Sequence, residues 1–148
     1  MGTHFKGNDE QVNTLNVFIK LMRASESMNA RLTRHLTDNN LTISQFGTLE
    51  VLLHLGCLNQ KEIGEKLLKS GGNITMVIDN LEKRGFVKRE TDPNDRRAVI
   101  ISLTDQGRSF IEEFFPLHLE KIMEEFSVLT ESEKETLARI SKKLGTRE

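Results

Sequence analysis

The stretch that decides the fold runs from residue 73 to residue 97 and reads NITMVIDNLEKRGFVKRETDPNDRR. Its first half carries apolar residues at positions i, i+3, i+4 and i+7, which form one stripe along a helix: Ile74, Val77, Ile78 and Leu81. Gly85 follows, and glycine is the preferred residue just past the end of a helix. We therefore expect a helix that ends near Arg84 and whose remaining surface is polar.

The second half of the same stretch changes its period. Residues 86–90 read as a strand, and Asp92 followed by Pro93 suits the first two positions of a type I turn. Apolar residues then alternate with other residues, as in a half-buried strand: Val99, Ile101 and Leu103. These features predict a hairpin whose tip holds Asp95, Arg96 and Arg97.

Before this stretch, the pattern is helical. Residues 10–38 carry apolar residues at spacings of three and four, which predict a long first helix. Thr42, with Gln45 three positions later, forms the capping box of a second helix that ends near Gly56. Asn59 and Glu62 predict the start of a short third helix in the same way. Ser70 is the expected cap of the helix that follows.

Two more helices follow the hairpin. Thr104 and Asp105 open a long helix that continues to Phe126, and Pro116 is expected to kink it. Thr130 with Glu133 forms another capping box, which starts the last amphipathic helix. The sequence thus predicts a mainly α protein in which two short helices and a tight turn precede a small β hairpin.

Composition narrows the possible functions. The 148 residues carry a net charge of −1, so the chain as a whole is not basic, yet residues 83–97 hold six basic residues against three acidic ones. No apolar run is long enough to cross a bilayer, and residues 1–10 do not read as a secretory signal. Cys57 is the one cysteine, so no internal disulfide forms, which fits a reducing compartment. We expect a cytoplasmic protein that does not bind a membrane.

The helix at about 71–84 and the hairpin suit double-stranded DNA. The major groove admits one helix, where asparagine pairs with adenine, arginine or lysine with guanine, and a threonine methyl group touches thymine. An arginine on the hairpin tip suits a narrow minor groove, and Asp95 could orient its guanidinium. A helix with one apolar stripe and a polar opposite face is also common as an ordinary surface helix without a binding role. The alternative function is a winged-helix module whose exposed helix face binds another protein. Exposed aromatic residues would mark the latter.

The stretch 41–107 resembles the MarR family of bacterial regulators. The segments that carry the resemblance are LTISQF (41–46), QKEIGEKL (60–67), NITMVIDNLEKRG (73–85), DPNDRR (92–97) and LTDQG (103–107). The resemblance implies a winged helix-turn-helix core at 41–103, flanked by helical regions at 1–40 and 104–148 that form a homodimerisation domain. The apolar faces of these flanking helices exceed what a small winged domain needs, which agrees with a dimer seam.

The resemblance also implies a function. The protein would be a transcriptional regulator without enzymatic activity that binds a two-fold symmetric DNA operator and releases it when a small molecule binds or an oxidant reacts. Repression is the expected mode, and activation is the alternative because operator position decides between them. The DNA-contacting residues would be Ser70, Asn73, Thr75, Met76, Asn80, Lys83, Asp95, Arg96 and Arg97.

Effector residues follow from the same resemblance. A phenolic or other amphipathic ligand would lie between the winged core and the helical region, near Phe18, Met22, Met28, Phe46, Phe110 and Phe114, although each is also a plausible core residue. Cys57 is a candidate oxidant sensor, but its sequence neighbours supply no positive charge and an inert thiol is the alternative. His4, His35, His54 and His118 are dispersed, so no metal site or cofactor is expected.

Overall fold

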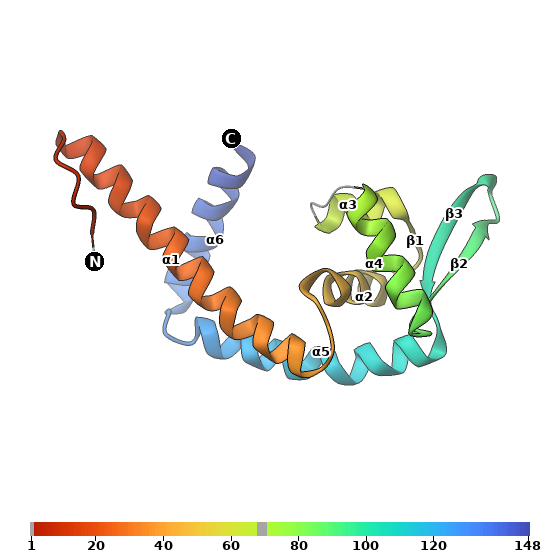
Figure 1. Cartoon of the computed structure of the whole chain (residues 1–148). Helices are drawn as coiled ribbons and strands as arrows, with labels where there is room; N and C mark the ends of the chain where they lie inside the picture. Colours follow the sequence, from red (N-terminus) through yellow and green to blue (C-terminus); the bar gives the residue numbers. More distant parts are fainter. Residues whose placement is uncertain (1, 68–70) are drawn as a thin grey trace.

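The computed structural model describes residues 2–67 and 71–148 of the chain. Its elements follow the predicted order: α1 (Asp9–Asp38), α2 (Ile43–Leu55), β1 (Leu58–Asn59), α3 (Gln60–Leu67), α4 (Gly71–Lys83), β2 (Val87–Asp92), β3 (Asp95–Leu103), α5 (Asp105–Phe126) and α6 (Glu131–Thr146). Figure 1 shows α2–β3 gathered at one end of α5, while α6, the first half of α1 and both termini lie at the other end. The prediction of a mainly helical fold with a small β hairpin is confirmed.

The helices α2 and α3 begin next to the residues that were predicted from the sequence to cap them. The Thr42 hydroxyl accepts the Gln45 backbone N–H at 3.1 Å, and the Gln45 side chain accepts the Thr42 N–H at 3.1 Å. Asn59 and Glu62 make the same reciprocal pair, both at 2.8 Å. Each pair satisfies backbone donors that a helix start leaves without partners. The predicted cap of α4, Ser70, lies outside the described residues.

Two glycines fix the junctions on either side of the hairpin. Gly85 has φ +78°, and the Phe86 N–H donates to the Leu81 carbonyl at 3.0 Å, which is how a Schellman motif ends α4. Gly107, in the first turn of α5, lies against the Phe86 carbonyl oxygen, which would be 1.9 Å from a Cβ atom at position 107. The hairpin is therefore held tightly against both the end of α4 and the start of α5.

The strands form one antiparallel sheet in the order β1-β3-β2. Sequence analysis missed β1, which pairs Leu58 with Ile101 and Asn59 with Ile100. Val99 was expected to share the buried face of this strand with Ile101 and Leu103, but it is 47% exposed. The expectation fails because the outer half of the hairpin extends past the helices, so that neither of its faces is covered (Figure 1).

The core lies where α2, α3, α4 and the sheet meet, and the end of α1 together with α5 covers the side of it that is lowest in Figure 1. Its central side chains are almost fully buried: Leu49, Leu52, Ile63, Ile74, Ile78, Leu81, Ile101 and Ile111. The last turns of α1 add Leu36 to this core. α5 runs as one helix through Pro116, and Figure 1 shows it curved without a break.

The end of the molecule that holds α6 and the first half of α1 is packed less tightly than the core. None of the residues of α6 is buried. Large apolar side chains on α1, α5 and α6 remain open to solvent, among them Val17, Phe18, Met22, Leu117, Met123, Ile140 and Leu144. Within the described residues, no helix is long and apolar enough to span a membrane.

Candidate nucleic-acid interface

α4 presents a polar face opposite its buried stripe. Asn73, Met76, Asn80 and Lys83 are all exposed, and their spacing of three, four and three residues places them on one side of the helix. Met76 is 65% exposed, although it is apolar and belongs to an otherwise well-packed region. The structure therefore brings four of the predicted DNA-contacting residues onto one surface.

The hairpin, which we call the wing, carries the other predicted residues. Asp95, Arg96 and Arg97 are exposed at the start of β3, just after the turn. The expected pair between Asp95 and an arginine guanidinium is wrong, because the Asp95 carboxylate accepts the backbone N–H of Arg97 at 3.0 Å. Aspartate beside a turn commonly accepts the backbone N–H two residues on. In the described part of the chain, Arg96 and Arg97 make no ion pair.

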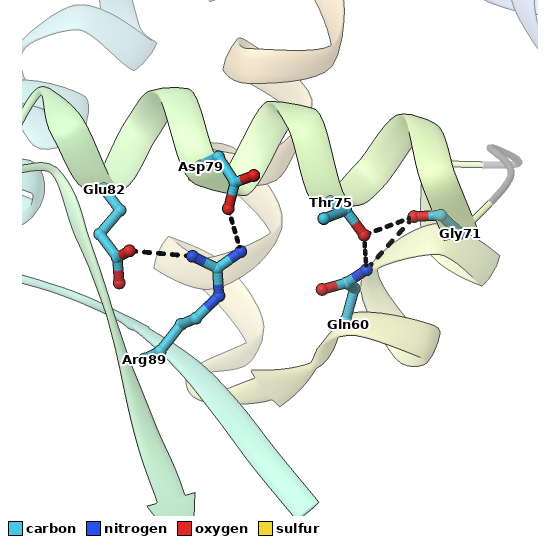
Figure 2. Close-up of polar contacts among 6 residues, drawn as sticks. All are labelled: Gln60, Gly71, Thr75, Asp79, Glu82 and Arg89. Carbon is cyan, nitrogen blue, oxygen red and sulfur yellow. Dashed lines mark hydrogen bonds and ion pairs between the residues drawn. The ribbon is translucent and has the colours of Figure 1, made fainter.

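Arg89 joins the wing to α4. Its guanidinium contacts Asp79 Oδ1 at 2.6 Å and Glu82 Oε1 at 2.9 Å, so one β2 side chain holds two carboxylates of the helix (Figure 2). Burial works to lower the pKa of Arg89, but the bonds to Asp79 and Glu82 outweigh it and the pKa is raised. These two ion pairs fix the wing relative to α4, and they neutralise the Asp79 and Glu82 carboxylates beside the polar face of the helix.

The first turn of α4 is held by a residue of α3 that sequence analysis did not single out. Thr75 Oγ1 donates to the Gly71 carbonyl at 3.0 Å, and Gln60 Nε2 donates to the same carbonyl at 3.2 Å and to Thr75 Oγ1 (Figure 2). The Thr75 side chain is exposed, but its hydroxyl is already hydrogen-bonded within the protein, to Gly71 and Gln60. No sequence signal marks Gln60, because its partners lie 11 and 15 residues away.

A histidine pair lies where α1, α2 and α5 meet. The Nδ1 atoms of His35 and His118 are 2.9 Å apart, and the two rings stack with their centroids 5.1 Å apart. His118 is only 3% exposed and also contacts Phe46 of α2. Burial lowers the pKa of His118, and the charge of His35 lowers it further. Sequence analysis described these histidines as dispersed, because they are far apart along the chain.

A series of ring contacts runs from this pair to the end of α4. Phe114 stacks on His35 with centroids 5.2 Å apart and on Phe110 at 5.7 Å, and Phe110 stacks on Phe86 at 4.7 Å. The Arg84 guanidinium lies 4.9 Å from the centroid of the Phe86 ring. The aromatic side chains of α5 therefore connect the helical region to the residues that end α4.

The predicted ligand residues fall into two groups. Phe46, Phe110 and Phe114 lie together, next to a groove of about 160 Å³ lined by Asn39, Phe110, Glu113, Phe114 and Leu117. Phe18 and Met22 are 57% and 45% exposed on the first half of α1. At 1.5 Å per residue, Phe18 lies roughly 27 Å along the helix from Leu36, which reaches the core. Met28 is half-buried between these two positions.

Cys57 is exposed in the short link between α2 and β1. A lysine that the sequence did not place near it, Lys88 of β2, interacts with it weakly, but the Lys88 ammonium is paired with Glu90 Oε1 at 2.9 Å. The pKa of Lys88 is raised mainly by its hydrogen bond to Glu90 and to a smaller extent by Cys57. Among residues 2–67 and 71–148, no group of three or more His, Cys, Asp or Glu side chains is arranged to hold a metal ion.

Two short helices, α3 and α4, followed by a β hairpin that pairs with the short strand before α3, define a winged helix-turn-helix protein. Comparison with known proteins agrees with this assignment of the fold. A family model described as the MarR family matches residues 41–99. The HTH-type transcriptional regulator MhqR of Bacillus subtilis (strain 168) is 36% identical over 132 residues, which cover 89% of this chain and 91% of that protein.

Two solved structures extend the likeness. The S. aureus MepR–DNA complex has a TM-score of 0.75 and 28% identity, and the match covers 88% of this chain and 98% of that one. Bordetella bronchiseptica BpsR, whose DNA binding is regulated by 6-hydroxynicotinic acid, has a TM-score of 0.77 and 26% identity, with 87% and 98% covered. The chain belongs to the MarR family. It is therefore a DNA-binding transcriptional regulator and not an enzyme.

Proposed function

We propose that this protein is a homodimeric repressor that binds a two-fold symmetric operator and releases it when a small effector binds. The observation that carries the proposal is the combination of an exposed polar face on α4 with two arginines on the wing that make no ion pair in the described residues. α4 would enter the major groove, and Arg96 would enter the adjacent minor groove.

The predicted residues other than Thr75 have the following roles in this arrangement. Asn73, Met76 and Asn80 would contact base edges, while Lys83 would contact a phosphate. Asp95 orders the backbone that carries Arg96 and Arg97. Ser70 remains a proposed phosphate contact. The MepR–DNA complex, whose chain is matched over 98% of its length, supports the same mode of binding here.

The dimer is supported by apolar surface that the single chain leaves uncovered. Ile140 and Leu144 of α6 are 49% and 59% exposed, and Phe18 of α1 is also open. Contiguous exposed apolar surface of this kind marks a protein–protein interface. Pairing α1, α5 and α6 of two copies would place two α4 helices on successive turns of DNA, with half-sites about ten base pairs apart.

The proposed effector is a small amphipathic compound of about one aromatic ring. The groove beside Phe110 and Phe114 measures about 160 Å³, close to the roughly 150 Å³ cavity that holds benzene in another protein. The regulation of BpsR by 6-hydroxynicotinic acid supports this class of ligand. A ligand there would contact α5 between the dimer region and the wing. Oxidation of Cys57, beside Lys88, is the proposed alternative signal.

The test begins with selection of bound duplexes from a random library by the purified protein. A two-fold symmetric motif would supply an operator, and recovery of no motif would contradict the proposal. Arg96→Ala should then weaken binding to the selected duplex at least about tenfold in a gel-shift titration, because the minor-groove contact is lost. The control is Arg108→Ala, an exposed α5 arginine that should leave affinity unchanged. Equal affinities for both variants would remove the wing from the interface.

A further inference from the structure

The first turn of α4 lacks the packing that holds the rest of the helix. Gly71 and Gly72 open the turn, and within the described residues no atom outside their chain neighbours and their own helix backbone lies within 4 Å of a Cβ placed at either position. Glycine also has the largest backbone entropy to lose on folding. From Ile74 onward the buried stripe anchors the helix, but its first residues have no side chain that reaches the core. Another contact must hold this end in place.

Gln60 provides such a contact. Its amide group donates to both the Gly71 carbonyl and Thr75 Oγ1, and Thr75 Oγ1 donates to the same carbonyl (Figure 2). The three groups form a closed ring of hydrogen bonds between the first residue of α3 and the first turn of α4. Gln60 itself is kept in place because it follows Asn59, which caps α3.

We infer that Gln60 is a positioning residue for the DNA-reading end of α4, and that the ring uses the one proton of the Thr75 hydroxyl, so that Thr75 offers DNA its methyl group and no hydrogen-bond donor. The inference rests on the proposed function and says what the predicted contact residue Thr75 offers to DNA. The N-terminal residues of a recognition helix are those that contact base edges, so the orientation of this turn sets which contacts form. A free methyl group favours the C5-methyl group of thymine, and a hydroxyl whose proton is used within the protein no longer donates to a base acceptor.

The variants separate the hydroxyl from the methyl group. Gln60→Leu and Thr75→Val each break the ring and keep side-chain size, whereas Thr75→Ser keeps the hydroxyl and removes the methyl group. We expect Gln60→Leu and Thr75→Val each to weaken binding to the selected duplex about fivefold, the equivalent of one net hydrogen bond. The double variant should lose little more than either single variant, because both remove the same ring. Gln106→Leu, an exposed glutamine in the first turn of α5, is the matched control.

Base preference gives a second readout, from a repeat of the library selection with each variant. Gln60→Leu and Thr75→Val should keep the wild-type motif, and Thr75→Ser should relax one position that favours thymine. Amide hydrogen exchange without DNA should become faster at Thr75 in Gln60→Leu and stay unchanged at Leu81, because the loosening is local.

Three outcomes would overturn the inference: wild-type affinity in Gln60→Leu, additive losses in the double variant, or a motif changed by Thr75→Val, which would mean that the hydroxyl reads DNA directly. These are distinct from failure of the proposed function, in which the wild-type protein itself recovers no motif. In that case both proposals fall together.

Discussion

The two ends of this molecule are packed in opposite ways. The winged lobe, residues 41–103, buries Leu49, Ile63, Ile74 and Ile101 almost completely. The helical arms are the first half of α1 and all of α6. No residue of α6 is buried, and apolar side chains such as Phe18 and Ile140 are exposed to solvent. α3 and α4 of the lobe are amphipathic in the same way as α1 and α6, so for these helices the difference does not come from local sequence.

If a second copy covers the arms, as proposed, the two regions obtain their stability from different sources. The lobe is complete within one chain, because its apolar stripes face one another. The arms have stripes of the same kind that face solvent, and a second copy of the chain would cover them. Substitutions should therefore act on folding in the lobe and on association in the arms.

The largest expected effect comes from adding one methyl group in the first turn of α5. Gly107→Ala would place a Cβ atom 1.9 Å from the Phe86 carbonyl oxygen, and this backbone atom cannot move aside without shifting the wing. We expect a loss of about 3 kcal/mol in the free energy of unfolding, measured by urea denaturation.

The matched control is the same change in an arm. A Cβ at Gly145 of α6 would have no atom within 4 Å, so Gly145→Ala should raise stability slightly, by about 0.5–1 kcal/mol, through helix propensity. Similar effects at the two glycines would show that the lobe and the arms do not differ in packing as described.

The second prediction concerns association. Ile140→Asp puts a charge on the exposed apolar face of α6, where the side chain is 49% exposed in the single chain. If a second copy covers this face, the charge should weaken the dimer at least about a hundredfold, because a buried unpaired carboxylate is costly. Sedimentation equilibrium measures the dissociation constant.

Val99→Asp provides the comparison, because Val99 is 47% exposed but lies on the wing. This variant should remain as dimeric as the wild-type protein. A monomeric wild-type protein at micromolar concentration, or a dimer that tolerates Ile140→Asp, would contradict the arm interface.

The smallest expected effect is a pH dependence at the junction of the two regions. Burial and then the charge of His35 lower the pKa of His118 below its usual 6.5, so the unfolded chain takes up this proton more readily than the folded one. The contribution to stability is therefore full above about pH 6.5 and is lost as pH falls toward the lower folded pKa.

The melting temperature of the wild-type protein should fall as the pH is lowered from about 7 to about 5.5. In His118→Phe, whose side chain takes up no proton, the fall should be smaller. His4→Phe, in the exposed N-terminal segment, should keep the wild-type profile. A His118→Phe profile that matches the wild type would remove the histidine pair as the cause.

Most of the fold was predictable because its signals are local. Capping pairs such as Thr42 with Gln45 lie three residues apart, and the stripe of α4 repeats within one helix. β1 was missed because Leu58 and Asn59 are too short a run to show any period. Val99 was misplaced because alternation reports which side chains share a face, not whether another element covers that face.

The candidate interface was predictable as a surface but not as a set of contacts. Asn80 and Arg96 could be assigned from residue type and position, and both are exposed as expected. The partners of Thr75, Asp79 and Glu82 could not be assigned, because Gln60 and Arg89 reach them from other elements. Contacts between elements depend on how helices and strands pack, and a single sequence carries no direct record of that.

The shortness of β1 has a consequence for solubility. β1 covers only Ile100 and Ile101 of β3, so the outer part of β3 has an unpaired edge on that side. Unpaired strand edges invite other chains to add to the sheet, and charged side chains on the edge oppose this by repulsion. Arg96 and Arg97 lie on this open edge. The same arginines that suit DNA would therefore also keep free copies of the protein from aggregating through their wings.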